Sequence, residues 1–253
     1  MLNILLFGSS HAASYSNLSN YKNISLSIAA NKGSGIFENI NFFENGSFVL
    51  KEDTSDWDKT VFLNSIGSSS NNINSYDFIL NNINLQVDFP QLIHGDKENI
   101  HEIYDTIDSL SDDLFLDILN NHNFNRYGID VSYIVDVLTD IGFSRESIFH
   151  IPIPFSLKPS SLPSKPNPIR INKKIEHLLS ILRKFILNKY GNVVLPSSNM
   201  FESGAFIKER FGVDDGSNTW KKVLKDKKPK LVKTVHDRIH KNSSYSKMIL
   251  DNF

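Results

Sequence analysis

The sequence has no cysteine, which excludes disulfide bonds, a thiol nucleophile and a metal site with thiolate ligands. It also has almost no net charge. The formal value is −1 at pH 7, so the chain as a whole is not built to bind nucleic acid. No stretch approaches the roughly 18 uninterrupted apolar residues that predict a membrane-spanning helix. These absences predict a soluble, cytoplasmic protein.

Several familiar motifs are missing as well. The eight histidines show no HExxH or similar zinc spacing, so we expect no metal. There is no GxGxxG run and no Walker lysine, which argues against a nucleotide-binding protein of the flavodoxin-like class, although Gly8-Ser9-Ser10 could cradle a phosphate. The apolar stretch Met1–Phe7 is too short for the core of a signal peptide, and no basic start precedes it.

What the sequence does contain is an alternation of short apolar runs and amphipathic stretches. Buried strands are predicted at Leu2–Phe7, Ile24–Ala30, Tyr76–Ile83, Ser147–Ile153 and Asn192–Leu195. Helices are predicted at Glu98–Leu119, Val131–Ile141 and Ile171–Tyr190, and Gly191 is placed to end the last one. This alternation predicts one α/β domain over residues 1–253, with a parallel sheet covered on both faces.

Three segments depart from the alternation. Residues 36–75 contain Asn45-Gly46 between apolar residues, which predicts a hairpin insertion. Residues 154–168 hold five prolines and four serines and are typical of a surface loop. Residues 212–236 are predicted to be a basic loop or helix insertion. Within them Lys221–Lys233 holds seven lysines and one aspartate, either an anion-binding rim for a coenzyme phosphate or acidic polysaccharide, or a solvated basic surface.

A serine follows the first predicted strand. The run Leu5-Leu6-Phe7-Gly8-Ser9-Ser10 passes from buried apolar residues into a turn of small ones. A serine there is exposed at the carboxyl edge of the sheet, next to the free N–H groups of the following helix, as a nucleophile requires. An ordinary strand–helix junction would use the same residues as a helix cap. His11 is adjacent to Ser10, so it points away and is expected to be a site-wall or surface residue.

The other end of the chain carries an acid–base pair. Asp237 precedes His240 by three residues, which puts both side chains on the same side of a turn. A carboxylate so placed can hold an imidazole in one tautomer and stabilise the imidazolium that forms. The same residues would also suit a surface turn and helix start. The longer pattern Asp237-x-x-His240-x-Asn242-x-x-Tyr245, followed by a helix from Ser243 to Asp251, is more specific.

Together the serine turn and the terminal motif resemble the SGNH (GDSL-like) hydrolase and acyltransferase superfamily. The resemblance implies a flavodoxin-like three-layer α/β/α sandwich with a parallel sheet of about five strands. It implies Ser10 as nucleophile, His240 as general base and Asp237 as its orienting carboxylate. Gly8-Ser9-Ser10 stands where the family often has Gly-Asp-Ser, so Ser9 is the alternative nucleophile, and the register favours Ser10.

The same resemblance implies an oxyanion hole. The family adds a glycine N–H after the second strand, for which Gly33 or Gly35 is the candidate. It adds an asparagine side chain after the third strand, where Asn84 matches best and Asn82 is the alternative. The family's Gly-x-Asn-Asp is degenerate here, because Asn82 replaces the glycine and Leu85 the aspartate. Asn81 is expected to be a turn residue.

These residues predict a serine esterase or O-acyltransferase that forms an acyl-enzyme on Ser10. The resemblance implies small acyl groups such as acetyl, on carbohydrate, with no cofactor unless acyl-CoA serves as the donor of a transferase. The partners expected are therefore an acyl ester or acylated carbohydrate, with no nucleic acid and no membrane insertion. The alternative is a decayed module of the same fold that binds a glycan or a protein partner.

Overall fold

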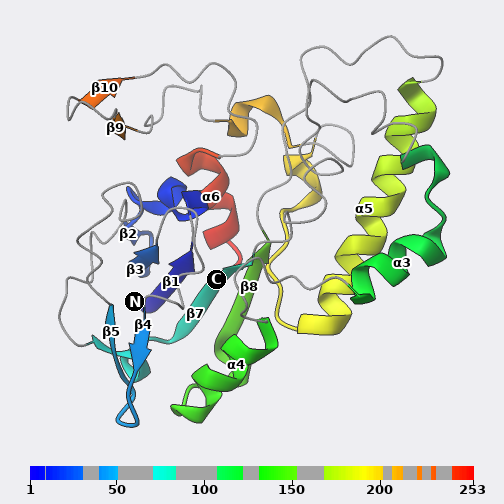
Figure 1. Ribbon diagram of the computed structural model, residues 1–253. Coiled ribbons are helices and arrows are strands. Elements are labelled where there is room, and N and C mark those ends of the chain that lie inside the picture. Colours follow the sequence, from blue (N-terminus) through cyan, green and yellow to red (C-terminus); the bar gives the residue numbers. More distant parts are fainter. Residues whose placement is uncertain are drawn as a thin grey trace.

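A computed structural model describes residues 1–8, 10–30, 40–50, 71–83, 107–121, 131–152, 168–201, 207–212, 221–223, 229–231 and 241–253. A five-stranded sheet with the order β2-β3-β1-β7-β8 lies at the middle of the molecule (Figure 1). Four of its strands are parallel and stand in the order of flavodoxin-like sheets: β3 lies on one side of β1, and β7 and β8 follow on the other side, so the strand order reverses at β1. The strands are β1 (Leu2–Gly8), β2 (Asn20–Tyr21, antiparallel), β3 (Ile24–Ala30), β7 (Phe78–Ile83) and β8 (Ile148–Pro152).

The parallel sheet predicted from the sequence is confirmed, with one change at its edge. The predicted strand Asn192–Leu195 is reduced to a single parallel bridge between His150 and Val193. This bridge consists of two backbone hydrogen bonds, each 2.8 Å long. His150 N donates to Asn192 O, and Val194 N donates to His150 O. Gly191 with a φ of 74° precedes the segment and Pro196 follows it, which leaves little extended chain to pair.

Hydrophobic cores cover both faces of the sheet. Side chains of a strand alternate between faces, so Ile4 and Leu6 of β1 belong to one core and Leu5 and Phe7 to the other. All four are fully buried. The first core includes apolar residues of α5 (Pro168–Tyr190) and α6 (Ser243–Leu250), and the second includes those of α4 (Val131–Asp140). The result is the expected three-layer α/β/α arrangement.

The predicted hairpin insertion is present and packs on the second core. β4 (Ile40–Phe42) and β5 (Ser47–Leu50) pair in antiparallel fashion, and β6 (Asn71–Asn72) adds a third strand. Gly46 has a φ of 74° in the connecting turn, a conformation that glycine adopts readily. The ring of Phe48 lies edge-on to Phe7 with the ring centroids 6.0 Å apart, so the hairpin is packed against the central strand.

The helices agree with the sequence pattern except at one point. α4 and α5 lie where they were predicted, and Gly191 follows α5 in the left-handed conformation of a C-cap. The predicted helix Glu98–Leu119 is not continuous: residues 98–106 lie outside the described parts, and Leu110 and Ser111 are not helical. α3 (Asp112–Asn121) begins instead at Asp112, because the Oγ of Ser111 accepts a hydrogen bond from Leu114 N at 3.1 Å and caps it.

The basic insertion also differs from the prediction of a loop or helix. Its described segments are two strands, β9 (Lys221–Val223) and β10 (Pro229–Leu231), paired as an antiparallel hairpin. The segment between them lacks the Asn-Gly signal that marks the other hairpin, so the pattern of charges alone did not predict strands. The remaining elements are the short 3₁₀ helices η1 (Ser10–Tyr15), η3 (Ile73–Ser75), η4 (Arg145–Ser147), η5 (Ser198–Met200) and η6 (Glu209–Phe211).

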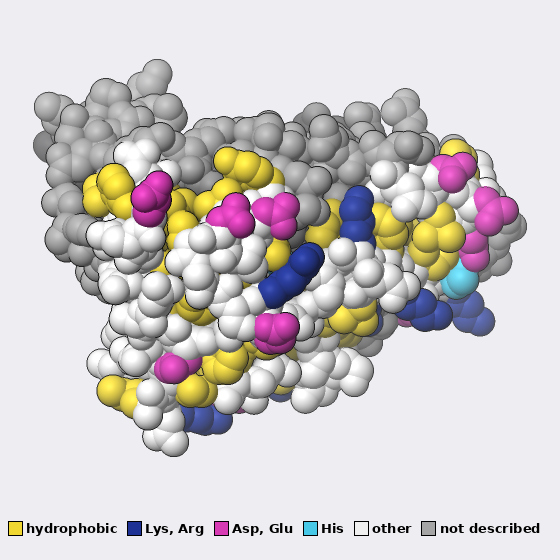
Figure 2. Space-filling model, turned by 90° about the horizontal axis from the view of Figure 1, so that it is seen from below, with side chains coloured by type: hydrophobic (Ala, Val, Ile, Leu, Met, Phe, Trp, Pro, Cys, Tyr) yellow, Lys and Arg dark blue, Asp and Glu magenta, His cyan; other side chains and the backbone are white. Residues whose placement is uncertain are grey.

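Contacts between distant segments tie the described parts together. The rings of Phe78 and Phe149 both pack against the C-terminal Phe253, with centroids 5.5 and 5.0 Å away. Nε2 of His177 in α5 lies 2.7 Å from Oδ2 of Asp112 at the start of α3, within hydrogen-bond distance. On the face shown in Figure 2, hydrophobic side chains are interspersed with polar and charged ones. No helix in the described ranges is long and apolar enough to cross a membrane.

Candidate active site

Ser10 lies at the junction that the sequence predicts. β1 ends at Gly8, and η1 begins at Ser10. β1 has β3 on one side and β7 on the other, so this junction is at the carboxyl end of an interior strand. In open α/β sheets, ligands bind outside the carboxyl ends of the strands where the strand order reverses. The described part of Ser10 is its backbone; its side chain and all of Ser9 lie outside the described parts.

The tail of the C-terminal motif is held by Asn242. Its Oδ1 accepts hydrogen bonds from Ser244 N at 2.9 Å and Tyr245 N at 3.2 Å, which caps α6. Its Nδ2 donates to the carbonyl oxygens of Arg210 and Gly212, each at 2.7 Å. Asn242, two residues after His240 in the sequence, therefore holds the start of α6 against the end of η6.

A backbone bridge strengthens this attachment. Lys241 pairs with Gly212 in an antiparallel bridge, and Asn242 N donates to Phe211 O at 3.0 Å. The ring of Phe211 packs edge-on against Tyr245, with the centroids 6.3 Å apart. The chain segment that carries Asp237 and His240 thus begins after Gly212 and returns to it at Lys241, so both of its ends are held at the same place.

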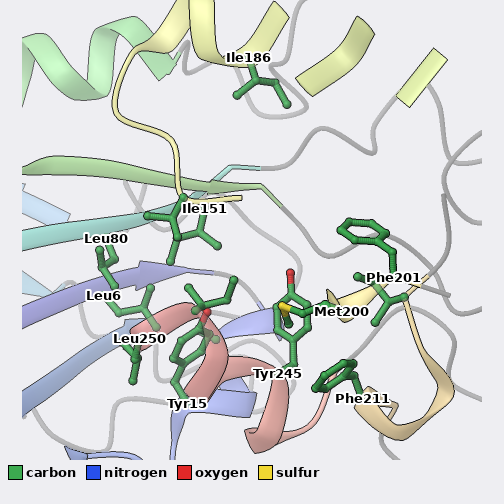
Figure 3. Packing of buried hydrophobic residues seen from close by; sticks show 14 of the residues in the cluster. Leu6, Tyr15, Leu80, Ile151, Ile186, Met200, Phe201, Phe211, Tyr245 and Leu250 are labelled. Carbon is green, nitrogen blue, oxygen red and sulfur yellow. The ribbon is translucent and has the colours of Figure 1, made fainter. Parts of the chain in front are cut away.

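A polar contact joins α6 to the helix that starts at Ser10. The Oγ of Ser246 donates to the Oγ of Ser14 at 2.6 Å, and the Oγ of Ser14 donates to the carbonyl oxygen of His11 at 3.0 Å. Ser246 is fully buried. Figure 3 shows Tyr15 of η1 and Tyr245 of α6 within one cluster of buried side chains that also contains Leu6 and Leu250. The element bearing Ser10 and the helix that follows His240 are therefore packed together.

The other predicted site residues lie outside the described parts in whole or in side chain. Asn82 belongs to β7, but its side chain is not described. The residues wholly outside the described parts are Asp237, His240, Gly33, Gly35 and Asn84. Their roles in a triad or an oxyanion hole stay predictions from the sequence.

His11 is not on the surface. It is the second residue of η1 and only 8% of its surface is exposed, so that alternative is wrong and its place in a site wall remains a prediction. It is buried because η1 packs into the first core through its neighbour Ala12, which is fully buried, and through Tyr15.

Asn81 is not the turn residue expected from the sequence. It lies within β7, opposite Phe7 on one side and His150 on the other, and it is 2% exposed. Its Nδ2 donates to Nδ1 of His150 across 3.4 Å. An amide nitrogen donates, so as placed this contact suits an Nδ1 of His150 that accepts the hydrogen bond. The strand continues through Asn81 because both of its neighbours in the sheet, β1 and β8, pair with it there.

His150 is a buried histidine for which the sequence predicted no role. It is 1% exposed, and its ring packs against that of Tyr190 with centroids 6.1 Å apart. Burial, and to a smaller extent the positive charge of Arg145, lower the pKa of His150 from 6.5 to about 4. The signal in the sequence was a polar residue inside the apolar run Ile148-Phe149-His150-Ile151, at a position that the alternation of strands assigns to the core.

Two phenols are also buried near the junction of η1 and α6. Burial raises the pKa of Tyr15 and of Tyr245, so both are protonated at every physiological pH. The hydroxyl of Tyr245 has no hydrogen-bond partner among the described residues. Neither ring is therefore a base, and Tyr245 serves the packing of α6.

A surface hollow of about 540 Å³ lies elsewhere, between α3 and α5. Its lining includes Leu116, Ile181, Phe185 and Lys184. It shares no element with the candidate catalytic residues. Among the described residues, no group of three or more histidine or acidic side chains is placed to hold a metal ion.

Comparison with known proteins finds no relative for the chain: no protein-family model, no curated protein and no solved structure matches it. The assignment of a function therefore depends on the residues and on their positions in the fold.

Proposed function

We propose that the protein is a serine esterase or O-acyltransferase of the SGNH type. One observation carries the proposal: α6, which begins three residues after His240, packs on η1, which begins at Ser10, through the hydrogen bond from Ser246 to Ser14. The elements that adjoin the two motifs, η1 and α6, thus converge beside the interior strand β1, and this contact supports the proposal. A structural role for either motif alone does not require that convergence.

The chemistry follows from the residue types. The Oγ of Ser10 attacks the carbonyl carbon of an ester and passes its proton to His240, while Asp237 holds the imidazole and stabilises its charged form. Collapse of the tetrahedral intermediate breaks the carbon–oxygen bond, and His240 returns the proton to the leaving alkoxide. Backbone N–H groups at the start of η1 and after β3, with Asn84 or Asn82, are the proposed donors to the oxyanion.

The acyl-enzyme is then resolved by a second nucleophile. His240 takes a proton from water or from a sugar hydroxyl, that oxygen attacks the acyl carbon, and the bond to Ser10 breaks as Ser10 regains a proton. Water gives an esterase and a sugar gives a transferase, for which acyl-CoA would be a donor. We propose small acyl groups such as acetyl on carbohydrate, and a cytoplasmic setting, which a chain without cysteine fits.

Ester turnover by single-residue variants tests the proposal. We expect the wild-type chain to hydrolyse p-nitrophenyl acetate, and we expect Ser10→Ala and His240→Gln to lower kcat/KM by at least about a thousandfold, the effect typical of losing a triad member. Asp237→Asn should lower it by a similar factor, because the imidazole then adopts the wrong tautomer.

His236→Gln is the matched control, because it removes a histidine one residue before Asp237 and should leave turnover unchanged. Equal activity of Ser10→Ala and wild type would refute the proposal. A folded chain that binds acylated oligosaccharide, turns over no ester and binds equally well as Ser10→Ala would instead be the decayed binding module.

A further inference from the structure

The hollow between α3 and α5 has the size of a site for a small molecule. Its volume is about 540 Å³, and it lies where α3 runs beside the C-terminal half of α5 (Figure 1). Small-molecule sites in proteins usually occupy about 300–1,000 Å³. Two residues of α3 and five of α5 line the hollow, so its walls are built on two regular helices rather than on loops.

The spacing of residues along α5 gives the hollow an apolar floor. Ile181, Lys184, Phe185 and Asn188 have the i, i+3, i+4, i+7 spacing of one helix face, and all four line the hollow. The neighbouring face of α5, which includes Leu182, is buried in the first core. Ile181 and Phe185 pack against that core but are only half-buried, so part of their apolar surface is left for a ligand.

α3 supplies an apolar side chain to the opposite wall. Leu116 lines the hollow and is 37% exposed. A single exposed leucine is ordinary on a protein surface, but this one lines the same hollow as Ile181 and Phe185. A sugar or an inorganic ion would lose hydrogen bonds to water against these three side chains without replacing them. The lining therefore favours a ligand with an apolar body.

The rim of the hollow is positively charged. Lys184 and Lys189 are both exposed, and Lys184 forms no ion pair with any described residue. Nζ of Lys189 lies 5.3 Å from the centroid of the Phe185 ring, so its charge is beside the apolar floor. Among the described residues that line the hollow, none is acidic; Asp117, next to Leu116 in the sequence, is not part of the lining. The rim therefore favours a ligand with a negatively charged end.

We propose that this hollow binds a free medium-chain fatty acid, with the alkyl chain against Leu116, Ile181 and Phe185 and the carboxylate at Lys184. The alkyl chain matches the apolar floor, and the carboxylate complements the charge of the rim. A protein partner fits less well, because a stable interface uses about 20–30 residues on each side and the hollow has seven. The site shares no residue with the candidate triad, so this inference does not rest on the proposed function.

Calorimetric titration of the full chain with sodium decanoate, below the concentration at which it forms micelles, tests the inference. Leu116→Glu should weaken binding by at least about tenfold, because it replaces an apolar wall with a carboxylate that repels the ligand. Its matched control is Leu114→Glu, which changes an exposed leucine of α3 outside the lining and should leave the Kd within about twofold. Lys184→Gln should weaken binding by about threefold, the effect of one exposed ion pair, and Lys173→Gln should not.

Relatives of decanoate test the class of ligand. Hexanoate should bind at least about tenfold more weakly, because it buries fewer methylene groups. Decanol and decyltrimethylammonium should also bind more weakly, because neither carries a negative charge to meet the rim.

Three results would overturn the inference: no binding of decanoate, equal effects of the two leucine variants, or binding of decanol as tight as that of decanoate. Binding to vesicles of phosphatidylglycerol without binding of decanoate would overturn it too, and would assign the surface to a membrane. Ser10→Ala should bind decanoate like wild type, so failure of the esterase proposal and failure of this one are measured separately.

Discussion

At the residue scale, His150 is the group whose chemistry the fold changes most. Its pKa of about 4 in the folded chain lies below the ordinary value of 6.5, so the unfolded chain takes up the proton first as the pH falls. The buried neutral ring therefore does not lower the free energy of unfolding above about pH 6.5, and the free energy of unfolding falls as the pH drops from 6.5 to about 4. The loss over that range is about 3 kcal/mol, at 1.36 kcal/mol for each unit of pKa.

The pH prediction is checked by urea unfolding of wild type and His150→Gln. Wild type should lose stability more steeply between pH 6.5 and pH 4.5 than the variant does, because glutamine removes the titrating ring. His177→Gln serves as the control, since His177 is an exposed histidine paired with Asp112. Parallel stability curves for wild type and His150→Gln would show that burial of His150 does not govern the acid sensitivity.

Tyr245 gives a second prediction at this scale, of opposite sign to most core substitutions. Its ring is 1% exposed and its hydroxyl has no hydrogen-bond partner among the described residues. Removing that hydroxyl relieves a desolvation cost and leaves the ring in place, so Tyr245→Phe should raise the free energy of unfolding by about 1 kcal/mol. Tyr21→Phe is the control, because the Tyr21 hydroxyl donates to Asp251 at 3.0 Å and its loss should not stabilise.

At the element scale, the attachment of α6 depends on both polar atoms of the Asn242 side chain, the Oδ1 that caps the helix and the Nδ2 that donates to two carbonyl oxygens. Asn242→Ala removes the cap of α6 and two hydrogen bonds to the Arg210 and Gly212 carbonyls, and should lower the free energy of unfolding by about 2–4 kcal/mol. Asn242→Asp keeps the cap but cannot donate to the two carbonyls, so it should also destabilise. An Asn242→Asp chain as stable as wild type in urea would mean that only the cap matters.

The turn of the β4–β5 hairpin gives the other prediction for an element. Gly46 and Gly191 share a φ of 74°. A Cβ added at Gly46 would lie 2.4 Å from Nδ2 of Asn74, whereas a Cβ added at Gly191 would have no atom within 4 Å. Both alanine variants should cost about 1–2 kcal/mol for the left-handed backbone, and Gly46→Ala should cost more. Thermal unfolding of the two variants measures the difference, and a larger cost at Gly191 would contradict the contact.

Helices and strands were predicted correctly from the sequence where the apolar periodicity and the residues that end an element indicated the same boundaries. The strand Ile24–Ala30 and the helix ending at Tyr190 match the structure because the apolar spacing and the residues at their ends predicted the same boundaries. The predicted helix Glu98–Leu119 differs from the structure because Ser111, a serine inside the apolar pattern, caps a new helix that begins at Asp112. The β9–β10 hairpin was missed because its lysines carry no periodic apolar signal.

At the scale of the whole molecule, the order of the strands brings the ends of the chain together. β1 lies inside the sheet, and α6, formed by nearly the last residues, packs on η1 directly after it. The sequence predicted which residues to look for at this junction through its two short motifs. It could not predict Asn81 and His150, because a pair across neighbouring strands depends on the register of the sheet, which no local pattern specifies.

The most direct test of Ser10 as the nucleophile is the intact mass of the chain, quenched in acid shortly after mixing with an activated acetyl ester. For wild type and Ser9→Ala, we expect a gain of one acetyl group that maps to Ser10 by peptide sequencing. For Ser10→Ala we expect no gain. A gain that persists in Ser10→Ala, or no gain in wild type together with no ester turnover, would contradict the assignment of Ser10 as the nucleophile.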